Sequence, residues 1–192
     1  MASDNFASIL RNPGRLVWDP TDLSIAFPHG GKSLGFTRDG VLVQTIVGAT
    51  PLVAEDFGGV EPFNYMFIGQ LYTLSADLIQ WDDDTLQVAF PGGLTVAGGT
   101  SGERVVQYPG TLDQASLLSS VSGKLLFSPE DLTSGKVVLF KKVVPFIADA
   151  SEILFRRSEH ASLKVVFRAL RDIALAAAKQ VVEVGDRRDI TI

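Results

Sequence analysis

Apolar residues in this chain recur at every second position more often than at helical spacing, and Gly and Pro separate the apolar runs. A period of two places alternate side chains on opposite faces of an extended backbone, so a strand can bury one face and keep the other in water. With 46% hydrophobic residues over 192 positions, the chain has enough apolar material for a core. The pattern therefore predicts a mostly β domain.

Two long strands are predicted with the most regular alternation, over residues 66–81 and 162–170. Further strands are predicted over 122–127 and 136–146. A β-hairpin is predicted over 33–46, because Asp39-Gly40 lies within it and Gly accepts the positive φ of tight turns. In the first long strand, one face carries Tyr72, Leu74, Ala76 and Leu78, and the other carries Thr73, Ser75 and Asp77.

A short helix is predicted over about 83–90. Asp82, Asp83 and Asp84 precede apolar residues at helical spacing, and Pro-Gly-Gly follows. Acidic side chains cap free N–H groups at a helix start, which makes capping the preferred interpretation. The alternative is a Ca²⁺ or Mg²⁺ site, but a calcium loop alternates its ligands and needs a Gly and a distal Glu.

The remaining segments are interpreted from their composition. Residues 92–110 contain Gly-Gly twice and few large apolar residues, so we expect a long loop there. Residues 173–180 are rich in Ala, and a helical turn and a final strand both remain open. No repeat or linker divides the chain, which predicts one domain over 1–192, a β-sandwich or barrel with one small helix.

The side chains available for catalysis are few. The chain has no Cys and only two His, His29 in a Pro-His-Gly-Gly turn and His160 before a predicted strand. We interpret His29 as a loop residue and His160 as a polar or interface residue, not as catalytic bases. Neither a Gly-x-Ser-x-Gly elbow nor a phosphate-binding Gly-rich loop occurs. We therefore expect no enzymatic activity, cofactor or metal.

The charge is unevenly distributed. From Asp39 to Glu103 there are nine acidic residues and no Lys or Arg, while the remainder holds the other 13 acids and all 17 bases. We interpret the acidic span as a surface that should not adhere to anions. The basic pairs at 141–142 and 156–157 are expected to meet acids of a neighbouring subunit or to lie on the surface. At a pI of about 5.0, groove binding to nucleic acid is not expected.

Targeting signals are not predicted. The first twelve residues lack the basic start and apolar run of a signal peptide, and no apolar stretch approaches the roughly 20 residues that span a bilayer. We expect a soluble protein in a cytoplasm-like compartment, without a membrane partner.

Three stretches, taken in order, resemble the tail tube proteins of long-tailed bacteriophages. They are Pro-His-Gly-Gly-Lys-Ser-Leu-Gly over 28–35 before a hairpin, Glu-Asp-Phe-Gly-Gly-Val-Glu-Pro over 55–62 leading to Ile-Gly and a long strand, and Phe-Arg-Arg over 155–157 before His160 and the strand over 163–170. Together they span about three-quarters of the chain. The Ala-rich end is longer than is usual in the family, which leaves a tail terminator, a baseplate-proximal ring protein or a contractile-tail tube open.

The resemblance implies a β-sandwich or barrel-like subunit with one short flanking helix. Six subunits would form a ring, and rings would stack into a tube through which the genome passes. The chain would then be a virion protein, found in the host cytoplasm during assembly, that contacts itself and other tail proteins such as the tape measure, terminator and distal tail or baseplate. The N-terminal segment 1–25 and the loop 92–120 would contact adjacent rings.

Residues for the channel or the subunit interface follow from this resemblance and the charge pattern. The candidates are Asp77, Asp82, Asp83, Asp84, Lys164 and Arg168. Lys164, Arg168 and Arg171 form a basic stripe that does not suit an acidic channel, so we expect it to pair across subunits.

Two other functional classes remain open. In the first, Tyr65, Tyr72, Trp81 and Tyr108 line the cavity of a β-barrel that binds a small molecule or carbohydrate. In the second, the Asp82–Asp84 cluster serves an enzyme with a divalent cation.

Overall fold

The computed structural model describes residues 14–52, 64–90, 94–97, 104–107, 118–129, 136–147, 162–176, 180–187 and 189–192. Within these ranges the chain is mostly β with a single short α-helix, as the alternation predicted. The strands are β1 (Gly14–Trp18), β2 (Lys32–Ser33), β3 (Thr37–Leu52), β4 (Asn64–Leu78), β5 (Leu94–Ala97), β6 (Arg104–Gln107), β7 (Gly123–Pro129), β8 (Lys136–Ile147), β9 (Leu163–Ala169) and β10 (Val182–Asp186). The helices are α1 (Asp83–Ala89) and the 3₁₀ helix η3 (Leu118–Val121).

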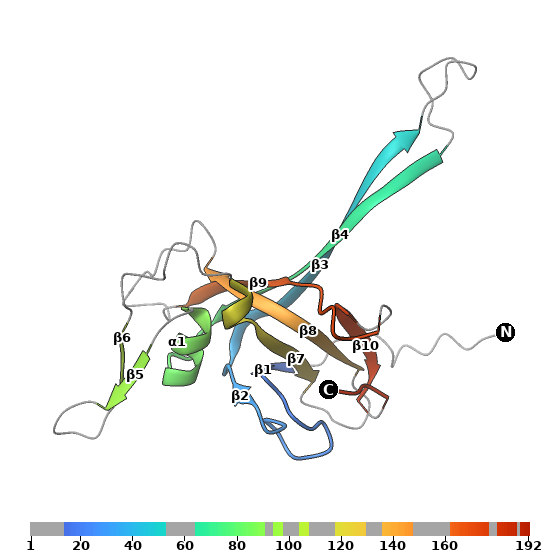
Figure 1. The fold of residues 1–192 in the computed structure, drawn as a ribbon. Coiled ribbons are helices and arrows are strands. Elements are labelled where there is room, and N and C mark those ends of the chain that lie inside the picture. The colour runs from blue at the N-terminus through green and yellow to red at the C-terminus, as the bar shows by residue number, and fades with distance from the viewer. Residues whose placement is uncertain are drawn as a thin grey trace.

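One antiparallel sheet forms the body, in the order β2-β1-β7-β8-β9-β4-β3, and β5 and β6 pair separately (Figure 1). β10 lies on the same edge of β8 as β9: β10 pairs with residues 136–140 of β8 and β9 with residues 143–147. The partner of β8 changes from β10 to β9 between Lys141 and Lys142. There, Lys141 N–H donates to Val181 O, and Leu170 N–H donates to Lys142 O. The Ala-rich segment is therefore part of the connection between β9 and β10, and its described residues include a turn at 173–174.

The sheet curls around its core. After β2, Leu34 N–H donates to the carbonyl of Leu16 on β1. Two residues after Leu34, the carbonyl of Phe36 accepts a hydrogen bond from Ile79 N–H, directly after β4. The segment over 34–36 thus connects the β2–β1 end of the sheet to the residue that follows β4. Inside the curl, the ring centroids of Trp18 and Phe167 lie 6.2 Å apart. The fully buried side chains here include Leu16, Leu34, Leu74, Leu78, Phe140, Leu163 and Phe167.

Helix α1 covers part of this core with Val88 and Ala89. Asp82 is its N-cap, and its carboxylate accepts a hydrogen bond from Thr85 N–H at 2.8 Å. Asp83 and Asp84 occupy the first turn, where negative charge favours the helix dipole. The capping interpretation of this triplet is confirmed for Asp82.

The hairpin predicted over 33–46 is wrong. β3 runs without a turn from Thr37 to Leu52 and pairs with β4 over its whole length. Gly40 has a φ of +85°, and the pairing register shifts between Arg38 and Val41, so this glycine serves a β-bulge. A positive φ at Gly fits a bulge as well as a turn, which is why the Asp-Gly signal was misleading.

The two segments expected to contact adjacent rings contain strands, which corrects the expectation of a loop over 92–110. The long loop expected over 92–110 contains the paired strands β5 and β6, with register Leu94 to Gln107. In the N-terminal segment 1–25, β1 is an interior strand of the sheet between β2 and β7. Residues 1–13, and the rest of the 92–120 segment up to 117 apart from β5 and β6, lie outside the described residues.

Candidate interaction surface

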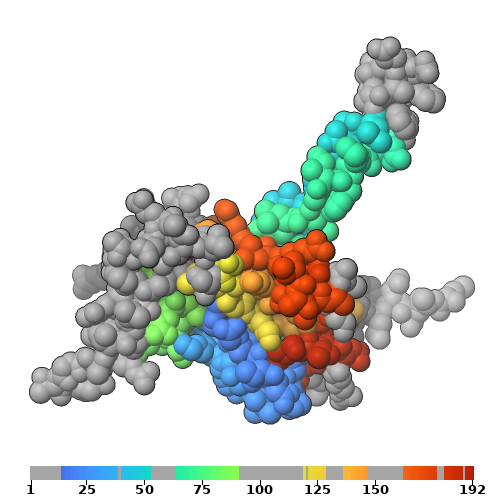
Figure 2. Space-filling model, viewed as in Figure 1, coloured from blue at the N-terminus to red at the C-terminus, as the bar shows by residue number. Residues whose placement is uncertain are grey.

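β3 and β4 extend from the body as a two-stranded arm (Figure 1). β9 pairs with β4 over residues 73–78 alone, so beyond Thr73 the described part of the chain gives β4 no partner other than β3. In the space-filling view the arm stands clear of the body (Figure 2). The arm consists of residues 45–52 of β3 and 64–72 of β4, and residues 41–44 of β3 adjoin its base opposite residues 73–76 of β4.

Large apolar side chains on the arm and on the adjoining residues 41–44 of β3 face solvent, each with 41–66% of its surface exposed. They are Leu42, Val43, Ile46, Val47, Tyr65, Met66, Phe67, Ile68 and Leu71. An isolated two-stranded hairpin is marginally stable in water, and contiguous exposed apolar surface of this kind marks an interaction site. The exposed apolar surface of the arm is therefore a candidate interaction site.

Both faces of the arm are apolar. Ile46 lies directly opposite Leu71 on one face, and Val47 projects from the other. Sequence reasoning missed this surface, because it placed the start of β3 in a hairpin over 33–46 and assigned no strand to residues 47–52. The available signal was that residues 41–52 read Val-Leu-Val-Gln-Thr-Ile-Val-Gly-Ala-Thr-Pro-Leu, with apolar residues at consecutive positions instead of every second one.

β3 also forms an edge of the sheet along its 16 residues. In an edge strand, the N–H and C=O groups on the outer side are available to a strand from another molecule. The edge and the apolar faces lie on the same arm, so one partner could pair with the edge strand and cover the apolar side chains.

At the base of the arm, three of the predicted interface residues share one face of the sheet. Asp77 on β4 lies opposite Lys164 on β9 and Arg38 on β3, and Arg168 lies opposite Thr73 on the same face. The Arg168 guanidinium carbon is 4.7 Å from the ring centroid of Phe146. Arg38, Asp77 and Lys164 help line a groove of about 520 Å³. Lys164 and Arg168 of the predicted basic stripe thus lie on one face of the sheet, and Arg38 lies on the same face.

Asp82, Asp83 and Asp84 are not part of that face. They lie at the start of α1, where Gln80 Nε2 donates to Asp82 and Lys32 Nζ lies 3.1 Å from Asp84 Oδ1. The structure therefore separates the six predicted residues into a mixed-charge group at the arm base and an acidic group at the helix. Arg171, the third residue of the predicted stripe, donates through Nε to the Gln180 side chain.

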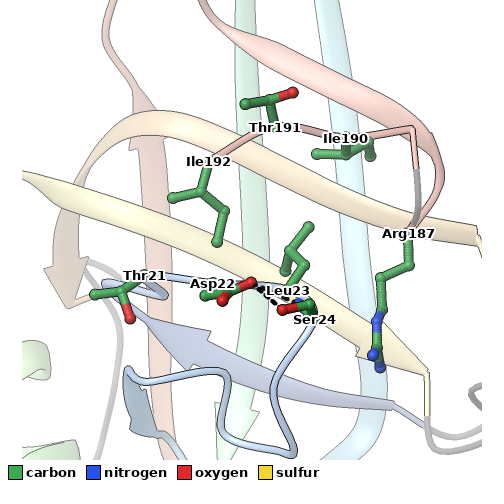
Figure 3. Close-up of a pocket in the computed structure, with 8 residues that line it drawn as sticks. All are labelled: Thr21, Asp22, Leu23, Ser24, Arg187, Ile190, Thr191 and Ile192. Atoms are coloured by element: carbon green, nitrogen blue, oxygen red, sulfur yellow. Dashed lines mark hydrogen bonds between the residues drawn. The ribbon is translucent and has the colours of Figure 1, made fainter.

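A separate pocket of about 610 Å³ lies between the loop after β1 and the residues after β10 (Figure 3). Asp22 accepts hydrogen bonds from Ser24 N–H and Ser24 Oγ at 2.8 and 2.7 Å, and these bonds hold the Asp22 pKa below its usual value. Arg187 Nη1 is buried there without a hydrogen-bond partner. The pocket lining thus combines a carboxylate and a guanidinium with the apolar side chains of Leu23 and Ile190.

His29 belongs to the same loop and is fully buried. Its Nδ1–H donates to Ile25 O at 2.9 Å, and its Nε2 lies 3.3 Å from Ser128 Oγ. Burial lowers the His29 pKa, the hydrogen bond to Ile25 opposes that shift, and nearby Arg187 adds to it. His29 is a loop residue, as predicted, but one that anchors its loop to β7. His160 lies outside the described residues.

Acidification is expected to destabilise the fold through His29. Because its pKa is lower in the folded chain than the usual 6.5, the unfolded chain binds the proton more readily, and unfolding free energy falls as the pH drops below about 6.5. His29→Asn retains a side chain that tolerates the φ of +59° but cannot titrate. Urea unfolding at pH 7.5 and 5.0 should show a smaller pH-dependent loss in the variant. Equal losses would contradict this assignment.

Lys141 corrects the expectation that the basic pair at 141–142 meets a neighbouring subunit. Its side chain is 4% exposed, and Nζ lies 3.0 Å from Glu183 Oε2 on β10 and donates to Thr191 O. This ion pair is internal. The pair at 156–157 lies outside the described residues.

Three of the four aromatic residues assigned to a ligand-binding barrel are described, and these three do not line a common cavity. Tyr65 lies on the arm with 62% of its surface exposed, whereas Tyr72 and Trp81 pack against the core. Tyr108 lies outside the described residues. The interior of the curl between the described strands is filled by the buried Leu, Val and Phe side chains.

Compared with known proteins, the sequence matches no protein-family model, and the search of curated proteins finds no significant match. No helix in the described ranges has the length and hydropathy to cross a membrane.

Proposed function

We propose that this chain is a structural subunit that assembles with copies of itself into stacked hexameric rings, as in the family it resembles, to form the tail tube of a long-tailed bacteriophage. The β3–β4 arm carries the proposal, because a ribbon with apolar residues on both faces and an open edge needs partners beyond its own body. The sequence resemblance over 28–35, 55–62 and 155–170 supplies the family.

Ring formation suits this arrangement physically. A strand edge that pairs with a different surface of the next copy makes a heterologous contact, and such contacts close into a ring when the rotation between copies matches. The mixed-charge face of Arg38, Asp77, Lys164 and Arg168 then serves as a contact between copies, since its net positive charge would hold DNA phosphates instead of letting them slide. A tail terminator or baseplate ring protein would use the same contacts.

In this proposal the protein has no catalytic role. It resides in the virion tail after assembly in the host cytoplasm, it contacts the tape measure, terminator and distal tail or baseplate proteins, and DNA passes it without specific recognition.

Electron microscopy of the purified full chain across a concentration series, with light scattering for mass, tests the proposal. Rings or hollow filaments are the expected result. A monomer at every concentration would contradict self-assembly by this chain and favour a ligand-binding domain.

A further inference from the structure

The mixed-charge face at the base of the arm has an excess of positive charge among its described side chains. Arg38, Lys164 and Arg168 share this face with one carboxylate, Asp77, and all three basic residues are exposed. Leu42, which is 55% exposed, also lines the groove there, so the groove continues into the apolar surface that leads to the arm. A partner that covers the arm and its base therefore also meets this positive charge.

The acidic group at the start of α1 has charge of the opposite sign. Asp82, Asp83 and Asp84 are consecutive and partly exposed, and Lys32 Nζ lies 3.1 Å from Asp84 Oδ1. Three carboxylates and one ammonium group give this surface a net charge of −2. Three basic side chains and one carboxylate give the mixed-charge face a net charge of +2. The two surfaces are therefore complementary in charge.

These two surfaces lie on opposite sides of the sheet. Asp77 and Leu78 are consecutive residues of β4, so their side chains project to opposite faces. Leu78 belongs to the same buried cluster as Val88 and Ala89 of α1, which places α1 on the core side of β4. Asp77 and the basic residues beside it lie on the other side. A subunit with opposite charges on two sides can bind identical copies head to tail.

We propose that the mixed-charge face of one copy binds the acidic group at the start of α1 in the next copy. This inference rests on the proposed function and names an electrostatic contact between its subunits. The contact is heterologous, because each copy contributes a different surface to it. Attraction between the two surfaces also orients copies as they approach one another, which an apolar contact through the arm does not do.

Charge reversal of each surface, alone and together, tests this contact in the full chain. The acidic set is Asp83→Lys with Asp84→Asn, and it keeps Asp82, which caps α1. The basic set reverses two residues and neutralises the acid between them, so that no carboxylates face one another across the strands. Its changes are Arg38→Glu, Asp77→Asn and Lys164→Glu.

Each set alone should raise the concentration for half-maximal assembly, measured by light scattering, roughly tenfold or more, because it places like charges in the contact. The two sets together exchange the signs and make the contact attractive again, which should return that concentration to within about threefold of the wild-type value. Near-UV circular dichroism establishes that each monomer stays folded. Asp189→Lys, at an exposed position after β10, is the control for a single charge reversal and should assemble as wild type.

Rescue by the combined sets separates this contact from other ways of weakening assembly. A combined variant that assembles no better than the weaker of its two parents, or wild-type assembly by either set alone, would overturn the contact and leave the proposed function intact. If a reversal unfolds the monomer, Asp83→Asn and Arg38→Gln replace the two sets, and a purely additive effect on assembly would overturn the contact. A wild-type chain that never assembles would instead contradict the proposed function and this inference with it.

Discussion

Replacing Phe67 and Ile68 together by Asp is expected to abolish assembly and leave the monomer folded. Both side chains are more than 60% exposed and belong to neither core cluster, so the body loses no packing. In an assembly that covers them, each contributes about 1.5–3 kcal/mol of apolar burial. Losing both, and forcing carboxylates into the contact, should raise the assembly concentration by roughly a hundredfold or more.

The measurement is light scattering across a concentration series, with near-UV circular dichroism to establish that the monomer stays folded. Val184→Asp is the matched control, because Val184 is 59% exposed and lies on β10, away from the arm. If the double variant assembled at the wild-type concentration, the outer part of the arm would not be part of the interface.

The amino-acid sequence alone was sufficient to predict the strands that bury one face. In residues 72–78 of β4 and in β9 the buried apolar residues occupy every second position, and Leu74, Leu78, Leu163 and Phe167 are buried as that alternation requires. The start of α1 was also predictable from the sequence, because a capping carboxylate accepts a hydrogen bond from an N–H group two or three residues away. These are local effects, and the residues that cause them lie within a few positions of one another.

The arm was not predictable in the same way. Gly40 gives the same local signal whether the chain turns back or continues through a bulge, and the pairing of β3 with a distant strand decides between them. The mixed-charge face at the arm base likewise depends on which strand lies beside β4. Lys164 and Asp77 are 87 positions apart, and only the register of β9 on β4 brings them opposite.

Removing the carboxylate of Glu183 should be one of the most destabilising polar substitutions in the described part of the chain. Lys141 is buried, and Glu183 with the carbonyl of Thr191 surrounds its ammonium group. Glu183→Gln leaves that charge in a poorly solvated site, and breaking a buried pair from one side costs about 3–5 kcal/mol. Urea unfolding at neutral pH measures the loss.

Two comparisons identify burial as the cause. Asp84→Asn removes the partner of Lys32 in a pair whose side chains are 44% and 50% exposed, and there we expect a loss of about 0–1 kcal/mol. The double variant Lys141→Met, Glu183→Met removes both buried charges and should be more stable than Glu183→Gln alone, since no unpaired charge remains. If Glu183→Gln lost no more than Asp84→Asn, the ammonium group would be reaching water, and the ion pair would not hold β10 against β8.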